Sequence, residues 1–192
     1  MSVNPVEIKA ALRRQLRERL QSLSAEERSH ASAQIRQRLA EQPVWRKARS
    51  ILLYAPTASE PDLWPLAIEA LSLGKSVALL RYLPDRDSYV PCLIREPSGD
   101  LQPGRFGIPE PAAHCPKFEL KQLDLALVPG IGFTLDGGRL GRGKGYYDRL
   151  LAEVPGFKCG VAFDCQVAAE FPLEPHDVRL NCILTPSHWL EL

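Results

Sequence analysis

The chain has 192 residues, of which 45% are hydrophobic and 24% are charged, and its formal net charge is +1. A chain of this length and composition suits one folded unit with a substantial core, so we expect residues 1–192 to form a single domain. No apolar run reaches the roughly 20 residues that cross a membrane, and the amino terminus does not resemble a secretory signal. We therefore expect a cytoplasmic protein, a monomer, with no membrane partner.

The cysteines and histidines show no pattern typical of a metal centre or a disulfide framework. The cysteines are odd in number and form no C-x-x-C pair, so reduced and buried thiols are expected. The four histidines lie far apart and are assigned no chemistry. The cysteines are Cys92, Cys115, Cys159, Cys165 and Cys182.

Charge is unevenly distributed along the chain. Residues 1–50 hold eleven Lys and Arg against five Asp and Glu, a net charge of +6, whereas residues 51–192 hold 13 against 18, a net charge of −5. A basic segment beside an acidic body suggests an anionic partner. A nucleic acid and a nucleotide phosphate both fit this description, and so does a plain solvated helix face.

The amino-terminal segment, residues 1–45, is predicted to form basic helices that pack on the rest of the domain. Ser24 and Glu27 have the spacing of a capping box, which predicts a second helix from about Ala25 to Glu41. In the first helix, apolar residues every four positions predict a buried stripe, and the basic residues that follow each of the first three form an adjacent stripe on the helix. The apolar stripe is Ile8, Leu12, Leu16 and Leu20, and the basic one is Lys9, Arg13 and Arg17.

After residue 50, strand patterns alternate with helix patterns. A helix is predicted to begin at Pro61, directly after Glu60, with Gly74 as the C′ residue that follows its end. Residues 97–117 are rich in Pro and Gly and predict an ordered surface loop. The alternation predicts an α/β fold with a mostly parallel sheet covered on both faces. Strands are expected at 50–55, 76–80, 89–94, 123–128, 158–163 and 178–184, and a further helix at about 145–153.

The segment 137–148 carries the strongest functional signal. It places five glycines within the nine residues 137–145, with three cations between them, and a predicted helix follows directly. Glycine amides can approach an anion closely, a helix amino terminus adds positive potential, and interleaved cations can neutralise a polyphosphate. Asp148 lies in the first turn of that helix, where it can hold Mg²⁺ directly or through water.

Other glycine-rich motifs fit this segment less well. Gly138 to Lys144 matches G-x-x-x-x-G-K, but Gly145 stands where a P-loop has the Ser or Thr that binds Mg²⁺. The loop also begins about ten residues after its strand, and its glycine spacing departs from the dinucleotide-binding fingerprint. A flexible glycine turn is the remaining alternative, although such turns rarely alternate Gly with Arg and Lys.

The residues Leu127-Val-Pro-Gly-Ile-Gly-Phe133 and Arg139-Leu-Gly-Arg-Gly-Lys-Gly-Tyr-Tyr-Asp148 resemble the signature of the 5-formyltetrahydrofolate cyclo-ligase family, also called 5,10-methenyltetrahydrofolate synthetases. The resemblance covers nearly the whole chain. It implies a three-layer α/β/α fold similar to the sugar-phosphate isomerase and CoA-transferase group. It also implies an enzyme that uses ATP and Mg²⁺ to close 5-formyltetrahydrofolate into 5,10-methenyltetrahydrofolate, through a phosphorylated formyl intermediate, with release of ADP and phosphate.

The resemblance also implies roles for particular residues. Arg142 and Lys144 would stabilise charge on the transferred phosphoryl group, and Asp148 matches a metal-ligand position. Asn181 stands where some relatives have a second acidic ligand, so a contact there would lack charge. Substrate positions match Ala55, Glu60, Phe106 and Tyr147; for Glu60 a helix N-cap is the alternative, and for Phe106 an ordinary loop anchor. ATP-binding positions match Lys9, Arg13, Arg139, Leu140, Gly141, Arg142, Gly143, Lys144, Gly145, Tyr146 and Tyr147.

Two other functions compete with this interpretation. The basic amino-terminal half fits a nucleic-acid-binding module, but acidic residues interrupt it and no aromatic stacking platform accompanies it. An enzyme of the same fold that acts on another reduced folate is the closer alternative, because Pro61-Asp62-Leu63 and Leu80 depart from the pattern of many relatives. We expect small-molecule partners and no nucleic acid.

Overall fold

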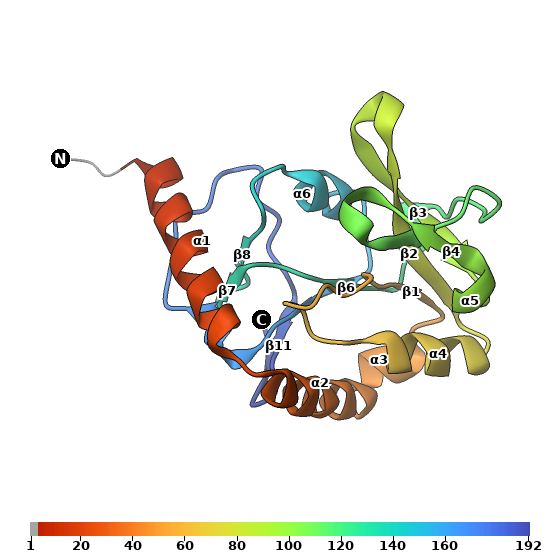
Figure 1. The fold of residues 1–192 in the computed structure, drawn as a ribbon, viewed down its shortest axis with the longest axis horizontal. Coiled ribbons are helices and arrows are strands. Elements are labelled where there is room, and N and C mark those ends of the chain that lie inside the picture. Colours follow the sequence, from red (N-terminus) through yellow and green to blue (C-terminus); the bar gives the residue numbers. More distant parts are fainter. Residues whose placement is uncertain (1–3) are drawn as a thin grey trace.

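The computed structural model describes residues 4–192, and a seven-stranded sheet lies at its centre (Figure 1). Its strands are β1 (Ser50–Leu52), β2 (Ser76–Leu83), β3 (Ser88–Ile94), β6 (Leu125–Val128), β9 (Phe157–Val161), β11 (Cys182–Leu184) and β12 (Trp189–Glu191). They lie in the order β12-β11-β9-β6-β1-β2-β3. The strands between the two edges run parallel, whereas β12 and β3 pair antiparallel with their neighbours. The mostly parallel sheet predicted from the sequence is confirmed.

Helices cover both faces of this sheet. The helices α2 (Ala25–Ala40), α3 (Pro43–Lys47) and α4 (Trp64–Ser72) lie on one face, and α6 (Tyr146–Leu151) lies on the other (Figure 1). Strand β1 contributes to both helix-covered faces, because neighbouring side chains of a strand point to opposite faces of the sheet. Ile51 packs into the core cluster beneath α2, α3 and α4, and Leu52 packs into the cluster beneath α6. The α/β fold with three layers is therefore confirmed.

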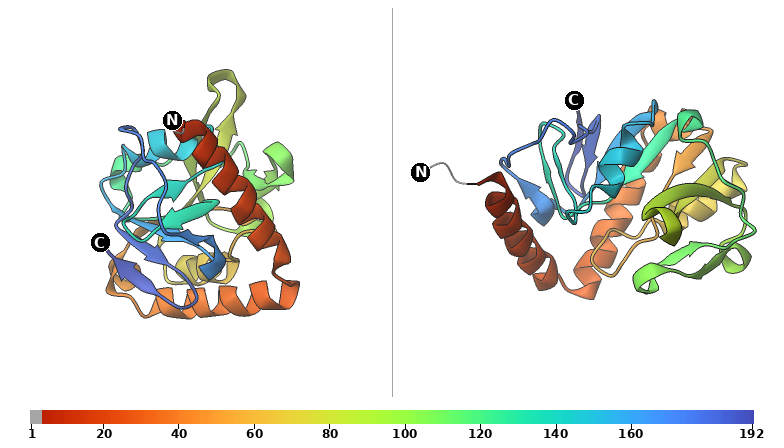
Figure 2. Two further views of the ribbon diagram at one scale, coloured as in Figure 1. Left: turned by 90° about the vertical axis from the view of Figure 1, so that its left-hand side faces the viewer. Right: turned by 90° about the horizontal axis from the view of Figure 1, so that it is seen from above.

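The first helix, α1 (Pro5–Ser22), stands apart from the helices on the central sheet (Figure 2). It packs against a small sheet of β7 (Gly132–Thr134), β8 (Arg139–Leu140) and β10 (Val167–Ala168). Leu16 is fully buried there, and it lies so close to Gly132 that a Cβ on this glycine would be 2.3 Å from Leu16 Cδ1. Ile8 is 36% exposed, so the predicted apolar stripe is wrong at its first member. No helix within residues 4–192 is long and apolar enough to span a membrane.

The predicted capping box at the start of α2 is confirmed. The Ser24 hydroxyl accepts from the Glu27 amide at 3.1 Å, and the Glu27 carboxylate accepts from the Ser24 amide at 2.7 Å. Replacing Ser24 with Ala should therefore lower the free energy of unfolding by about 1 kcal/mol, as loss of such caps does elsewhere. Urea denaturation measures the change. Ser29→Ala, at an exposed position on the same helix, is the control and should show no such loss.

Two predicted boundaries around Glu60 are wrong. Helix α4 begins at Trp64 and not at Pro61, because the carbonyl of Pro61 accepts from the buried Tyr54 hydroxyl and the Asp62 side chain accepts from the Trp64 amide. Strand β1 ends at Leu52, earlier than the predicted Ala55. The end of α4 agrees with the prediction, since Gly74 has a φ of 73° directly after the C-cap.

The segment predicted as a surface loop, 97–117, contains regular structure. Helix α5 (Pro97–Asp100) leads into a hairpin of β4 (Leu101–Pro103) and β5 (Pro109–Pro111) beside β2. Glu110 links this hairpin to β2, because its buried carboxylate accepts hydrogen bonds from the amides of Tyr82 and Arg105. The tight turn between the two strands brings Phe106 to the surface.

Candidate active site

One large cleft lies between α1 and the edge of the central sheet where the inner parallel strands end. Its volume is about 1060 Å³. The segment 54–60, which follows β1, and the segment 129–148, which follows β6, both contribute to its walls. Ligands of open α/β sheets bind at this edge, because the connecting loops leave it accessible. The cleft is therefore the natural candidate for a binding site.

The glycine-rich segment forms one wall of the cleft, but its first two residues are not loop. Arg139 and Leu140 form strand β8, and both are buried while still lining the cleft. Beyond them, Gly143 has a φ of 93° and Gly145 a φ of 66°, conformations that residues with a side chain rarely adopt. Residues 141–145 line the cleft, and helix α6 starts immediately after them.

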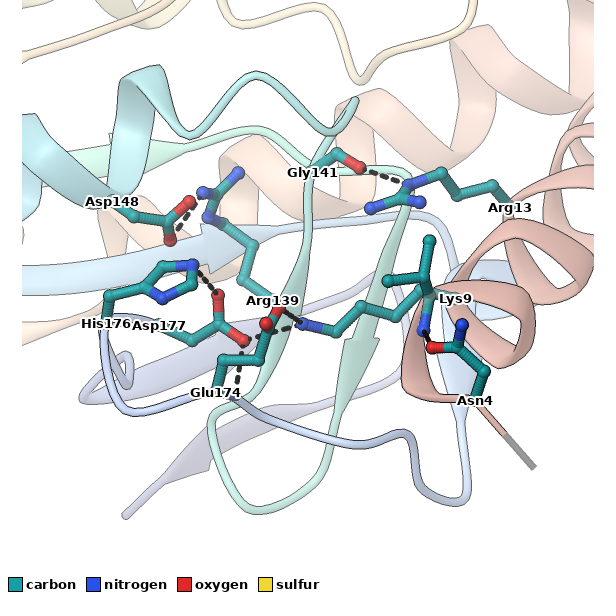
Figure 3. A network of polar contacts seen from close by, with 10 residues as sticks. Asn4, Lys9, Arg13, Arg139, Gly141, Asp148, Glu174, His176 and Asp177 are labelled. Atoms are coloured by element: carbon teal, nitrogen blue, oxygen red, sulfur yellow. Dashed lines mark hydrogen bonds and ion pairs between the residues drawn. The ribbon is translucent and has the colours of Figure 1, made fainter. Parts of the chain in front are cut away.

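Arg13 reaches across from α1 to this loop. Its Nε donates to the carbonyl oxygen of Gly141 at 2.9 Å (Figure 3). Burial lowers the pKa of its guanidinium, and the neighbouring charge of Arg17 acts in the same direction. The predicted placement of Arg13 beside the loop is confirmed, and its role in binding ATP stays a prediction.

Lys9 also points into the cleft, where it is held by two acids that the sequence pattern did not reveal. Its Nζ lies 2.8 Å from Glu174 Oε2 and 2.9 Å from Asp177 Oδ2 (Figure 3). Burial lowers the pKa of Lys9, but the hydrogen bonds to these carboxylates outweigh it and hold the pKa above its ordinary value. The ammonium group is thus charged and fixed before any ligand binds.

Arg139 and Asp148 form a buried ion pair beneath the loop. The distance from Arg139 Nη2 to Asp148 Oδ1 is 2.8 Å, and the two side chains are 4% and 14% exposed. The guanidinium also lies 5.3 Å from the ring centre of Tyr147, as in cation–π contacts. Its Nε–H is buried and has no hydrogen-bond partner within residues 4–192.

The donor set around Asp148 suits Mg²⁺. This cation keeps several waters and commonly takes one or two carboxylates together with phosphate oxygens. Asp148 offers one carboxylate at the cleft, with a single oxygen engaged by Arg139 among the described residues. Asn181 offers less, because it precedes β11 at the opposite end of the parallel strands and its Oδ1 accepts from the Lys158 amide at 2.9 Å. We therefore leave Asn181 out of the proposed metal site.

Glu60 connects the two sides of the cleft. Its Oε2 accepts from the amide and the hydroxyl of Thr57, at 2.9 Å each, and its Oε1 lies 3.3 Å from Arg142 Nη2. The Glu60 side chain is 13% exposed, whereas that of Arg142 is 57% exposed. The alternative interpretation of Glu60 as a helix N-cap is wrong, because Leu63 precedes the first residue of α4.

Two aromatic residues, Phe106 and Tyr147, also line the cleft. Phe106 is 79% exposed and has a φ of 61°, so the alternative of an ordinary buried loop anchor is wrong. Burial and the nearby Glu60 charge raise the pKa of Tyr147, which keeps its hydroxyl protonated. Ala55, three residues after the end of β1, also lines the cleft. A flat ring could be held by this set through stacking and through the carboxylate.

The predicted cations, glycines, aromatic residues and acids therefore gather around one cavity, with Asn181 the exception. Clustered cations, glycines and carboxylates at the edge of an α/β sheet are typical of an enzyme site for an anionic ligand. Residues 5–186 match the model of the 5-formyltetrahydrofolate cyclo-ligase family. The chain belongs to this family.

Curated and solved relatives agree with this assignment. The 5-formyltetrahydrofolate cyclo-ligase of Mus musculus is 30% identical over 92% of this chain and 92% of its own length. That of Escherichia coli is 30% identical over 90% of this chain and 97% of its own. The solved 5,10-methenyltetrahydrofolate synthetase of Aquifex aeolicus is 34% identical, with a TM-score of 0.86 over 96% of this chain and 92% of its own. The synthetase of Mycoplasma pneumoniae gives a TM-score of 0.75 at 28% identity, over 93% and 98% of the two chains.

Proposed function

We propose that this protein uses ATP to convert 5-formyltetrahydrofolate to 5,10-methenyltetrahydrofolate, with release of ADP and phosphate. Family membership supports the reaction. One observation supports placing the reaction in this cleft. Arg142, from the glycine-rich loop, lies 3.3 Å from Glu60, the acid proposed to bind folate. Two substrates bound at these neighbouring positions would meet.

The proposed chemistry has two steps. The formyl oxygen attacks the γ-phosphorus of ATP, so that an O–P bond forms, the bridging bond to the β-phosphate breaks, and ADP leaves. The substrate then carries a phosphorylated formyl group as an iminium phosphate. Next, N10 attacks the formyl carbon, phosphate leaves with its bonding electrons, and the N10 proton is lost. The protein performs no covalent step, so alignment and charge stabilisation must supply the acceleration.

The residues of the glycine-rich loop supply that stabilisation in our proposal. Arg142 and Lys144 are exposed at the cleft, so their side chains can turn toward the transferred phosphoryl group. Arg139 lines the cleft and would add positive charge beside the phosphates. Main-chain groups of Leu140, Gly141, Gly143, Gly145 and Tyr146 would complete the ATP site, together with Lys9, Arg13 and Tyr147.

Asp148 is the residue proposed to hold Mg²⁺. The ion would neutralise charge on the β- and γ-phosphate oxygens when it is bound. Arg139 keeps the Asp148 carboxylate oriented toward the cleft before ligands arrive.

We assign the basic face of α1 to the nucleotide and not to a nucleic acid. The supporting observation is that Lys9 and Arg13 make their contacts inside the cleft, with Glu174, Asp177 and Gly141, and do not form an outward-facing stripe.

Glu60→Gln should raise KM for 5-formyltetrahydrofolate by about tenfold, because a charged acceptor for the ring N–H groups is replaced by a neutral one. KM for ATP should stay close to the wild-type value. Steady-state kinetics with each substrate varied in turn measures both. The control is Glu69→Gln on the exposed face of α4. Equal increases in the two KM values would contradict the assignment of Glu60 to folate.

The test of the function itself is spectroscopic. Purified protein with 5-formyltetrahydrofolate, ATP and Mg²⁺ should produce the methenyl chromophore at longer ultraviolet wavelength than the substrate, with one ADP per product. Omitting ATP should abolish the signal. Absence of the chromophore under complete conditions would refute the proposal, and turnover of several other reduced folates in the same assay would reveal a different preferred acceptor.

A further inference from the structure

The tip of the β2–β3 hairpin is joined to the start of α6 through Asp87, a residue with no assigned role. The Tyr82 hydroxyl donates to Asp87 Oδ1 at 2.7 Å, and the Tyr146 hydroxyl donates to the same oxygen at 2.6 Å. Arg105 adds a longer ion pair, at 3.6 Å. Asp87 is 59 residues from Tyr146 in sequence, so this is a tertiary contact and not part of a local turn.

Aromatic packing reinforces the contact. The ring of Tyr89 lies between the other two, with centroids 5.2 Å from Tyr82 and 5.1 Å from Tyr146. We call Tyr82, Asp87, Tyr89 and Tyr146 the tyrosine clasp. Three of its members come from the hairpin, and the fourth is the first residue of α6. The clasp is therefore the connection between the hairpin and the end of the glycine-rich loop.

The geometry of Asp87 indicates that this connection is specific. Two hydroxyl donors on one carboxylate oxygen are charge-assisted hydrogen bonds, which are shorter and stronger than neutral ones. They hold the pKa of Asp87 below its ordinary value, the bond from Tyr146 having the larger effect. The residue also has a φ of 41°, a left-handed conformation that is uncommon for residues other than glycine. Nearby Asp85 has none of these features, because its one ion pair is a 3.8 Å contact with the adjacent Arg86.

Tyr146 links the tyrosine clasp to the glycine-rich loop. Tyr146 follows Gly145, whose φ of 66° allows the chain to turn between the loop and the helix. Lys144 stands just before that turn, and its carbonyl accepts from Arg149 Nη1 at 3.3 Å within α6. Anchoring Tyr146 therefore limits the directions that Lys144 can take.

We propose that Asp87 is a positioning residue that, through Tyr146, holds the end of the glycine-rich loop and Lys144 in place for the nucleotide. This inference rests on the proposed ATP-dependent function. The benefit is preorganisation, since a loop already fixed loses less conformational entropy when ATP binds.

Asp87→Gly is the informative variant, because glycine adopts the left-handed conformation freely and removes the acceptor without introducing strain. KM for ATP should rise by about fivefold, because Asp87 is 70% exposed and solvent weakens its hydrogen bonds. KM for 5-formyltetrahydrofolate should change little. Asp87→Asn, which retains an acceptor oxygen and tolerates the left-handed region, should restore most of the affinity for ATP. Asp85→Asn is the matched control and should behave like the wild type.

Tyr146→Phe removes the donor from the other side of the same bond. Combined with Asp87→Gly, it should raise KM for ATP no further than the larger of the two single changes, because both remove one interaction. Full additivity of the two effects would overturn the proposal. An unchanged KM for ATP in Asp87→Gly would overturn it too, as would equal increases in both KM values accompanied by a lower melting temperature.

Amide hydrogen exchange without any ligand gives a second test that needs no activity. Residues 142–147 should exchange faster in Asp87→Gly than in the wild type, and at the wild-type rate in Asp85→Asn. Unchanged exchange in Asp87→Gly would refute the positioning role. If the wild type lacks ATP-dependent turnover, the proposed function is refuted. The exchange result still decides separately whether Asp87 orders the loop.

Discussion

Lys144→Ala is expected to lower kcat by about 100- to 1000-fold, the loss found when one preorganised donor to a developing charge is removed. The reason is the position of Lys144 between Gly143 and Gly145, at the amino terminus of α6, where its ammonium can follow the charge on the transferred phosphoryl group. Arg142→Ala should have a similar effect, since the two cations act on the same group. Single-turnover measurement of the methenyl chromophore separates this chemical step from substrate binding.

The fold should tolerate these changes. Lys144 and Arg142 are both exposed, so neither contributes much packing. Lys121→Ala, at an exposed position on another part of the surface, is the control for general effects of removing a lysine. If Lys144→Ala retained the wild-type kcat, or if it unfolded, the loop cations would not have the catalytic role given to them here.

Arg139→Ala is expected to lower the free energy of unfolding by about 2 kcal/mol, because it leaves the part-buried Asp148 carboxylate without its partner. The two side chains are only 4% and 14% exposed, so solvent screens this pair weakly. The same change removes the cation–π contact with Tyr147 and a positive charge beside the proposed phosphate site, so turnover should fall as well. Urea denaturation gives the stability, and the chromophore assay gives the activity.

An exposed pair of the same type provides the control. Arg179 lies 2.6 Å from Asp136, but the two side chains are 58% and 62% exposed. Arg179→Ala should therefore cost less than about 1 kcal/mol, as surface ion pairs do. The double variant Arg139→Ala with Asp148→Asn should be less destabilised than Arg139→Ala alone, since the unpaired charge is gone. Equal losses for Arg139→Ala and Arg179→Ala would show that burial does not govern the first pair.

Local sequence signals predicted much of the fold, because each depends on residues close together in the chain. The capping box needs only Ser24 and Glu27, and the end of α4 needs only the left-handed conformation that Gly74 permits. The composition of the glycine-rich segment likewise marked it as part of a site, and its residues 139–148 do line the cleft. The strand patterns correctly indicated an α/β fold, although their ends were misplaced by a few residues.

Long-range partners account for what could not be predicted. The ion pairs of Lys9 join residues 165 and 168 positions apart, and no pattern around Lys9 indicates Glu174 or Asp177. The late start of α4 depends on Tyr54, whose hydroxyl takes the carbonyl of Pro61. Ile8 is exposed because the first turns of α1 extend beyond the small sheet that covers Leu16. In each case tertiary contacts decide a conformation that local propensity leaves open.

The cleft between α1 and the glycine-rich loop is proposed to hold the triphosphate of ATP. A crystal structure with Mg²⁺ and a non-hydrolysable ATP analogue is the decisive measurement. We expect the γ-phosphate within hydrogen-bond distance of Arg142 and Lys144, with Arg13 and Lys9 on the opposite side of the phosphates. A triphosphate bound away from these four cations would contradict it.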